Sequence, residues 1–148
     1  MTDARSSARA HWEGSLLEGG GFATTSSPAL DNTRVTWKAR TGGEAGTTPE
    51  ELLGAAHATC FSMALAGALA KAGHDVDHLD VSADVSFGPG DDGYEVKSIA
   101  LAVEGVVPDI DESTFRQFAE DAKSGCPISK ALDEHLAVTL DARLLQPA

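Results

Sequence analysis

Hydrophobic and polar residues alternate in several stretches of the chain, and in others the hydrophobic residues recur at helical spacing. Residues 9–17, 22–27 and 33–40 are short extended segments, separated by the glycines at 19–21 and by a turn signal at 31–32. Alternation with short polar breaks is typical of neighbouring antiparallel strands. The first 40 residues are therefore predicted to form an antiparallel meander.

A long helix and a hairpin are predicted next. The helix runs from about Pro49 to Ala72 and is ended by Gly73. A strictly alternating segment then predicts a strand, a "GPGDDG" loop follows it, and Tyr94–Val107 is the long partner strand. The alternating apolar residues of the first strand are Leu79, Val81, Ala83, Val85 and Phe87.

The last third of the chain predicts two helices and a strand. Asp111 is placed to cap a helix that Gly125 ends, Cys126-Pro127 opens a short helix, and Leu136–Leu144 alternates as a final strand. This order of elements predicts an α+β fold with a mainly antiparallel sheet. We expect one domain over residues 1–148, with residues 1–6 flexible.

Composition and charge narrow the function classes. The 148 residues are 42% hydrophobic and carry a formal net charge of −12, which argues against binding nucleic acid or an anionic membrane. The first 14 residues lack the apolar region of a secretory signal, so a cytoplasmic location is expected.

The longest weakly polar run, residues 52–70, is interrupted by His57 and Ser62. It therefore indicates a buried helix and not a membrane span. A small domain also gains buried area by dimerising.

The start of the long helix carries two acidic residues with different expected tasks. Thr48 is a good N-cap, Pro49 suits the first helical position, and Glu51 completes a capping box with Thr48. Glu50 either complements the helix dipole or is available to orient a cation.

The two cysteines, Cys60 and Cys126, have different surroundings. Without a C-x-x-C pair or clustered histidines, a metal site is not expected. Cys60 lies in an Ala- and Leu-rich helix that should be covered on most sides, so it is either an inert buried thiol or a reactive one beside a cation. Arg40 and Lys38, at the end of the third predicted strand, are the nearest preceding basic residues. Cys126 precedes a helix N-terminus, so local physics alone predicts that it is the more acidic thiol.

Two motifs together resemble the osmotically inducible protein C and organic hydroperoxide resistance family of thiol peroxidases. They are "ARTGGEAGTTPEELLGAAHATCFSMAL" and "AKSGCPISKAL", and "AHWEG" and "STF" are similar to the osmotically inducible branch. The resemblance covers nearly all of the chain. It implies an OsmC-like fold, with antiparallel sheets wrapped around long central helices in an intertwined homodimer, and two active sites at the interface.

By position, the resemblance implies that Cys60 attacks the peroxide, that Cys126 resolves the product as a disulfide, and that Arg40 and Glu50 form a pair supporting the thiolate. The implied substrates are organic hydroperoxides, with hydrogen peroxide as a further one. A dithiol such as a reduced lipoyl group is the implied reductant, and no metal or organic cofactor is required.

The sequence is also compatible with three other classes of protein. A small-molecule binding domain would use a pocket at the dimer interface without turnover. A thiol–disulfide oxidoreductase would reduce protein disulfides without peroxide, although the absence of C-x-x-C argues against it. A Cys/His hydrolase using Cys60 and His57 lacks an oriented third group and oxyanion donors. His57 is instead expected to be a packed or hydrogen-bonded histidine of the core.

Overall fold

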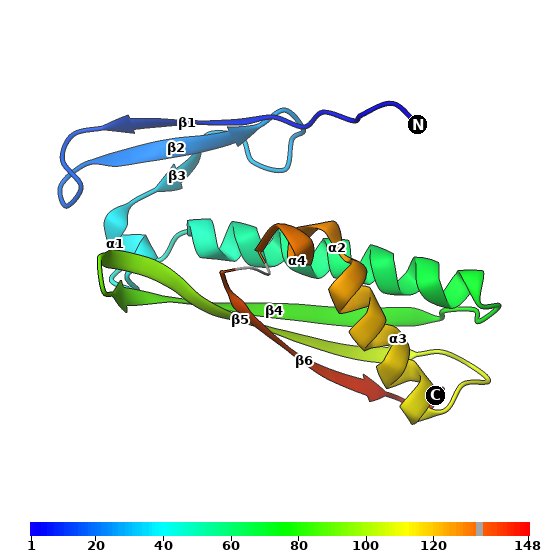
Figure 1. Ribbon diagram of the computed structural model, residues 1–148. Helices are drawn as coiled ribbons and strands as arrows, with labels where there is room; N and C mark the ends of the chain where they lie inside the picture. The colour runs from blue at the N-terminus through cyan, green and yellow to red at the C-terminus, as the bar shows by residue number, and fades with distance from the viewer. Residues whose placement is uncertain (133–134) are drawn as a thin grey trace. The chain divides into compact units, whose positions relative to one another are not determined.

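The computed structural model describes residues 1–132 and 135–148, which form two compact units (Figure 1). The first unit is Met1–Pro49 and the second is Glu50–Ala148.

The first unit is built on a three-stranded antiparallel sheet. Strands β1 (Ala8–Glu13), β2 (Gly20–Thr25) and β3 (Thr33–Val35) pair in the order β1-β2-β3. The predicted meander is confirmed. The third strand is shorter than predicted, however, because residues 37–40 form a helical turn, α1 (Trp37–Arg40).

Thr36 is the cause of this change from strand to helix. Its hydroxyl accepts a hydrogen bond from the Ala39 backbone N–H at 3.0 Å and donates one to the Glu44 carboxylate. A threonine that satisfies a backbone donor three residues ahead starts a helix. The prediction of a strand over residues 33–40 is therefore wrong for its second half, and Lys38 and Arg40 belong to α1.

The long helix α2 (Pro49–Lys71) begins the second unit and confirms the predicted helix to within one residue. The chain turns after it at Gly73, whose φ of +89° favours glycine. One stripe of α2 is buried, at Glu50, Gly54, His57, Phe61, Leu65 and Leu69. The expectation that α2 is covered on most sides is wrong for the single chain, since Met63 on another side is 71% exposed. By length and composition, α2 is also apolar enough to cross a membrane.

The second unit contains a mixed sheet in the order β4-β5-β6. Strands β4 (His78–Gly90) and β5 (Gly93–Val106) form the predicted hairpin, and their pairing reaches Gly90 and Gly93, so the predicted loop is a tight turn. Strand β6 (Ala137–Leu144) runs parallel to β5. Parallel neighbours need a crossover connection, and helices α3 (Glu112–Gly125) and α4 (Pro127–Leu132) lie in that connection.

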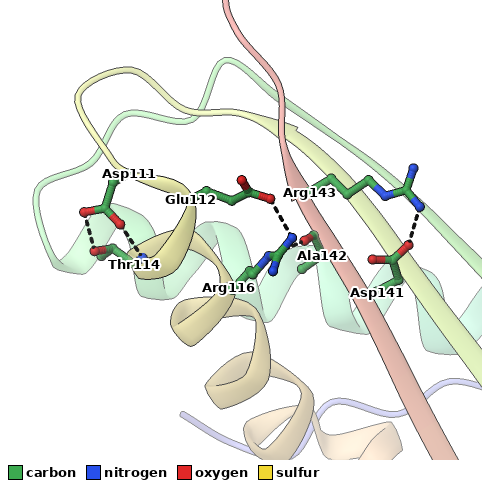
Figure 2. A network of polar contacts seen from close by, with 7 residues as sticks. All are labelled: Asp111, Glu112, Thr114, Arg116, Asp141, Ala142 and Arg143. Atoms are coloured by element: carbon green, nitrogen blue, oxygen red, sulfur yellow. Dashed lines mark hydrogen bonds and ion pairs between the residues drawn. The ribbon is translucent and has the colours of Figure 1, made fainter.

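Polar contacts fix the N-terminal part of α3 in this crossover (Figure 2). Asp111 is the N-cap, as predicted, and accepts from the Thr114 backbone N–H at 2.8 Å; this bond holds the pKa of Asp111 below its usual value. Arg116 donates from Nε to the Ala142 carbonyl of β6 at 3.1 Å and from a terminal nitrogen to Glu112 at 2.6 Å. These contacts hold the helix that leads to Cys126 against the sheet.

The core of the second unit lies between one face of the sheet and the helices. Phe61 and Leu65 of α2 are fully buried with Ile99 of β5 and Phe115 of α3. Burying such side chains is the main favourable term in folding. The same packing holds the middle of α2, where Cys60 lies, in a defined position.

Candidate active site

The two cysteines come from distant parts of the second unit and meet. Cys60 lies in the middle of α2, and Cys126 lies at the corner between α3 and α4. Both are free thiols, and their side chains are hydrogen bonded to each other. Packing of the crossover onto α2 therefore brings together two residues that are 66 positions apart in sequence.

Cys126 has the geometry of an N-cap for α4. Pro127 is the first residue of that helix, as predicted, and the backbone N–H groups of Ile128 and Ser129 donate to the Cys126 sulfur. The Ser129 hydroxyl donates to the same sulfur. Three donors directed at one sulfur favour its anionic form.

The two thiols differ in acidity within this unit. Burial raises the pKa of Cys60, and its hydrogen bond to Cys126 raises it further. Burial would also raise the pKa of Cys126, but the hydrogen bonds from Cys60, Ser129 and Ile128 outweigh burial and lower it below its ordinary value. The surroundings thus favour Cys126 as the more acidic thiol, which agrees with the prediction from local physics.

The two thiols also differ in exposure to solvent, and the more acidic thiol is the less exposed one. Cys126 is fully buried, whereas Cys60 is half-buried. Cys60 is therefore the thiol more open to a small electrophile from solvent, and Cys126 is placed to react with the product formed on Cys60. In a two-step thiol reaction, the more exposed Cys60 is suited to meet a substrate, and the more acidic Cys126 is suited to attack the product.

His57 lies one turn before Cys60 and is fully buried in the core. Its Nε2 is 2.7 Å from the Ser129 hydroxyl oxygen. Burial lowers the pKa of His57 below its ordinary value, so the ring is neutral at physiological pH. The prediction of a hydrogen-bonded core histidine is confirmed, and its partner is a residue that contacts Cys126.

Glu50 and Arg40 belong to different units of the chain. Glu50 is buried in the first turn of α2, ten residues before Cys60. Arg40 ends α1 in the first unit, where its guanidinium carbon lies 5.9 Å from the centroid of the Trp37 ring. This cation–π contact orients the arginine. The predicted pairing of Arg40 with Glu50, and its action on Cys60, stay predictions.

Sequence reasoning did not single out Ser129. Its position carried a signal nonetheless, because the third residue after an N-cap supplies a backbone donor to the capping side chain. In "CPIS" a serine at that place adds a side-chain donor to the same sulfur.

Comparison with known proteins places this arrangement in a family. The sequence model of the family described as "OsmC-like protein" matches residues 41–141. Peroxiredoxin OsmC of Escherichia coli is 46% identical over 136 residues, which cover 92% of this chain and 94% of that protein. The organic hydroperoxide resistance protein OhrB of Bacillus subtilis is 28% identical over 125 residues, covering 83% and 89%.

Solved structures agree on the fold. The crystal structure of Bacillus subtilis OhrB aligns with a TM-score of 0.73 and 25% identity, covering 93% of this chain and 98% of that one. An organic hydroperoxide resistance protein from Elizabethkingia anophelis aligns with a TM-score of 0.77 and 22% identity, covering 97% and 99%. The chain, with its two paired thiols, belongs to the OsmC family.

Proposed function

We propose that this protein is a cysteine-dependent peroxidase that reduces organic hydroperoxides, with hydrogen peroxide as a further substrate. One observation carries the proposal: a half-buried thiol, Cys60, is hydrogen bonded to a fully buried second thiol, Cys126. The relatives named peroxiredoxin and organic hydroperoxide resistance protein support the same activity.

The proposed cycle has two chemical steps in this chain. The Cys60 thiolate attacks the terminal peroxide oxygen, the O–O bond breaks, and the alkoxide takes a proton and leaves as an alcohol. Cys60 is then a sulfenic acid. The Cys126 thiolate next attacks the Cys60 sulfur, the S–O bond breaks, and hydroxide leaves with a proton as water. A dithiol of the lipoyl type then reduces the Cys60–Cys126 disulfide. This chemistry requires no metal or organic cofactor.

Arg40 and Glu50 complete the proposed site. Within the second unit, burial and Cys126 both act against ionisation of Cys60, so the attacking thiol needs a cation to offset them. A guanidinium keeps its charge in a dry site and can donate to the peroxide oxygens as the leaving group becomes negative. Glu50 would hold that guanidinium in place.

A homodimer is the proposed assembly, with the whole chain acting as one domain in the cytoplasm. An uncharged, exposed stripe along α2 supports it, formed by Ala55, Thr59, Met63 and Gly67. In the first unit, every residue of β1 is exposed, and Trp12 and Phe22 are 41% and 46% exposed. Exposed apolar side chains such as Met63, Trp12 and Phe22 can mark a protein–protein interface.

Steady-state peroxide consumption tests the proposal. We expect turnover of cumene and tert-butyl hydroperoxides with a dihydrolipoyl donor, and slower turnover of hydrogen peroxide. A thiol–disulfide oxidoreductase would instead reduce protein disulfides without peroxide. A binding domain would show no turnover, and its ligand affinity would survive replacement of Cys60.

Oxidation by one equivalent of peroxide should give an intrachain Cys60–Cys126 disulfide. The reason is that the two side chains are already hydrogen bonded in the reduced protein, and the bridge requires Cα atoms within about 7 Å. Non-reducing peptide mapping by mass spectrometry measures the product. A mainly interchain disulfide would contradict the proposed pairing.

A further inference from the structure

The buried hydrogen bonds around Cys126 continue beyond the two cysteines. The Ser129 hydroxyl donates to the Cys126 sulfur, and the same oxygen lies 2.7 Å from His57 Nε2. Ser129 is 5% exposed, while His57 and Cys126 are fully buried. These three buried residues form a continuous chain of polar groups.

The direction of these hydrogen bonds follows from the number of protons. A serine hydroxyl has one proton, so Ser129 must accept from His57 when it donates to Cys126. His57 is therefore the neutral tautomer with its proton on Nε2, and Nδ1 is a bare acceptor.

The surroundings of the ring agree with this assignment. Nδ1 of His57 is buried and has no hydrogen-bond partner among the described residues. A proton on Nδ1 would leave a buried donor unsatisfied, which is unfavourable. Burial independently favours the neutral ring, because removing the charged ring from water is unfavourable, and this lowers the pKa of His57.

We propose that Ser129 is a catalytic residue that stabilises the Cys126 thiolate for its attack on oxidised Cys60, and that His57 is a positioning residue that orients the Ser129 hydroxyl. The proposal rests on the peroxidase function above. It assigns the pair to the second chemical step, in which the S–S bond forms, the Cys60 S–O bond breaks and hydroxide leaves with a proton as water.

The expected size of the effect is set by two opposing trends. Losing a hydrogen bond to a charged group should raise the pKa of Cys126 by about one unit or more. Below that pKa, the thiolate fraction falls about tenfold per unit, while the remaining thiolate becomes about threefold more nucleophilic. Disulfide formation should therefore slow by at least about threefold.

Single-turnover kinetics with one equivalent of tert-butyl hydroperoxide separate the two steps. In Ser129→Ala, we expect slower disulfide formation and more trapped sulfenic acid, with no slowing of peroxide consumption. Ser129→Thr keeps the hydroxyl and serves as the matched control. His57→Leu should slow the same step, and His57→Gln should restore it, because a glutamine amide can donate to Ser129.

A second measurement does not depend on peroxidase activity. In a Cys60→Ser background, the thiolate absorbance of Cys126 reports its pKa, which Ser129→Ala and His57→Leu should raise and His57→Gln should not. If Ser129→Ala does not fold, the two His57 variants test the same hydrogen bond.

Two results would overturn the proposal for Ser129 and His57, and a third would overturn only the peroxidase function. Unchanged disulfide formation and an unchanged pKa would overturn the proposal, as would equal slowing of both steps, which indicates a structural role. If the wild-type protein consumes no peroxide, the proposed function fails, and the pKa measurement still decides whether Ser129 and His57 stabilise the thiolate.

Discussion

Replacing Cys60 by serine should abolish hydroperoxide reduction, whereas Cys126→Ser should oxidise once and then stop. The serine hydroxyl is a far weaker nucleophile than a thiolate, so no sulfenic acid can form in the first variant. In the second, a sulfenic acid forms on Cys60 and cannot be resolved. Excess peroxide should then convert it to sulfinic and sulfonic acids. Intact-mass spectrometry after timed additions of peroxide follows each product.

A matched control for this experiment lies on the same helix. Ser62→Ala removes a hydroxyl that donates to the Ala58 backbone carbonyl, and it should retain activity close to that of the wild type. The contrary outcome is specific. Loss of the first oxidation in Cys126→Ser, with its survival in Cys60→Ser, would mean that the more acidic thiol attacks the peroxide and that the two roles are reversed.

Mixing two inactive variants should restore activity if each site is shared between two chains. Glu50 and Cys60 are ten residues apart on one continuous helix, which separates them by roughly 15 Å along its axis. One arginine paired with Glu50 can hardly reach Cys60 of the same α2. The simplest arrangement takes Cys60 from one chain and the Arg40–Glu50 pair from its partner.

The test combines Cys60→Ser chains with Arg40→Ala chains under conditions that exchange subunits. A mixed dimer would contain one site with both changes and one with neither, so the isolated mixed species should recover about half of the wild-type activity. Dimers of each variant, treated in the same way, are the controls. No recovery despite proven exchange would mean that the site lies within one chain or that the dimer is not the active form.

Much of the second unit was predictable because its elements carry strong local signals. Asp111, Gly125 and Pro127 mark helix ends through their own backbone chemistry, and the alternation of β4 and β5 persists over a long hairpin. The direction of β6 carries no such signal. Its parallel pairing with β5 depends on how the crossover folds back onto the sheet.

The candidate site was predictable in part. The motifs identified both cysteines, and the helix N-terminus after Cys126 predicted its lowered pKa. The contact of Ser129 with His57 joins residues 72 positions apart, so local patterns could not reveal it. The error at residues 37–40 had a different cause. A short alternation resembled a strand, but the Thr36 hydroxyl accepts from the Ala39 backbone N–H and starts a helical turn instead.

The long strand β4 is an edge strand that carries exposed acidic residues. Within the described residues, β4 pairs with β5 along one side and forms the edge of its sheet. An edge strand of 13 residues offers backbone donors and acceptors to any other extended chain, which is a route to aggregation. Asp80 and Asp84 stand exposed along this edge. Two hairpins that approached edge to edge would bring like charges together, and this repulsion would disfavour pairing between the β4 strands of two molecules.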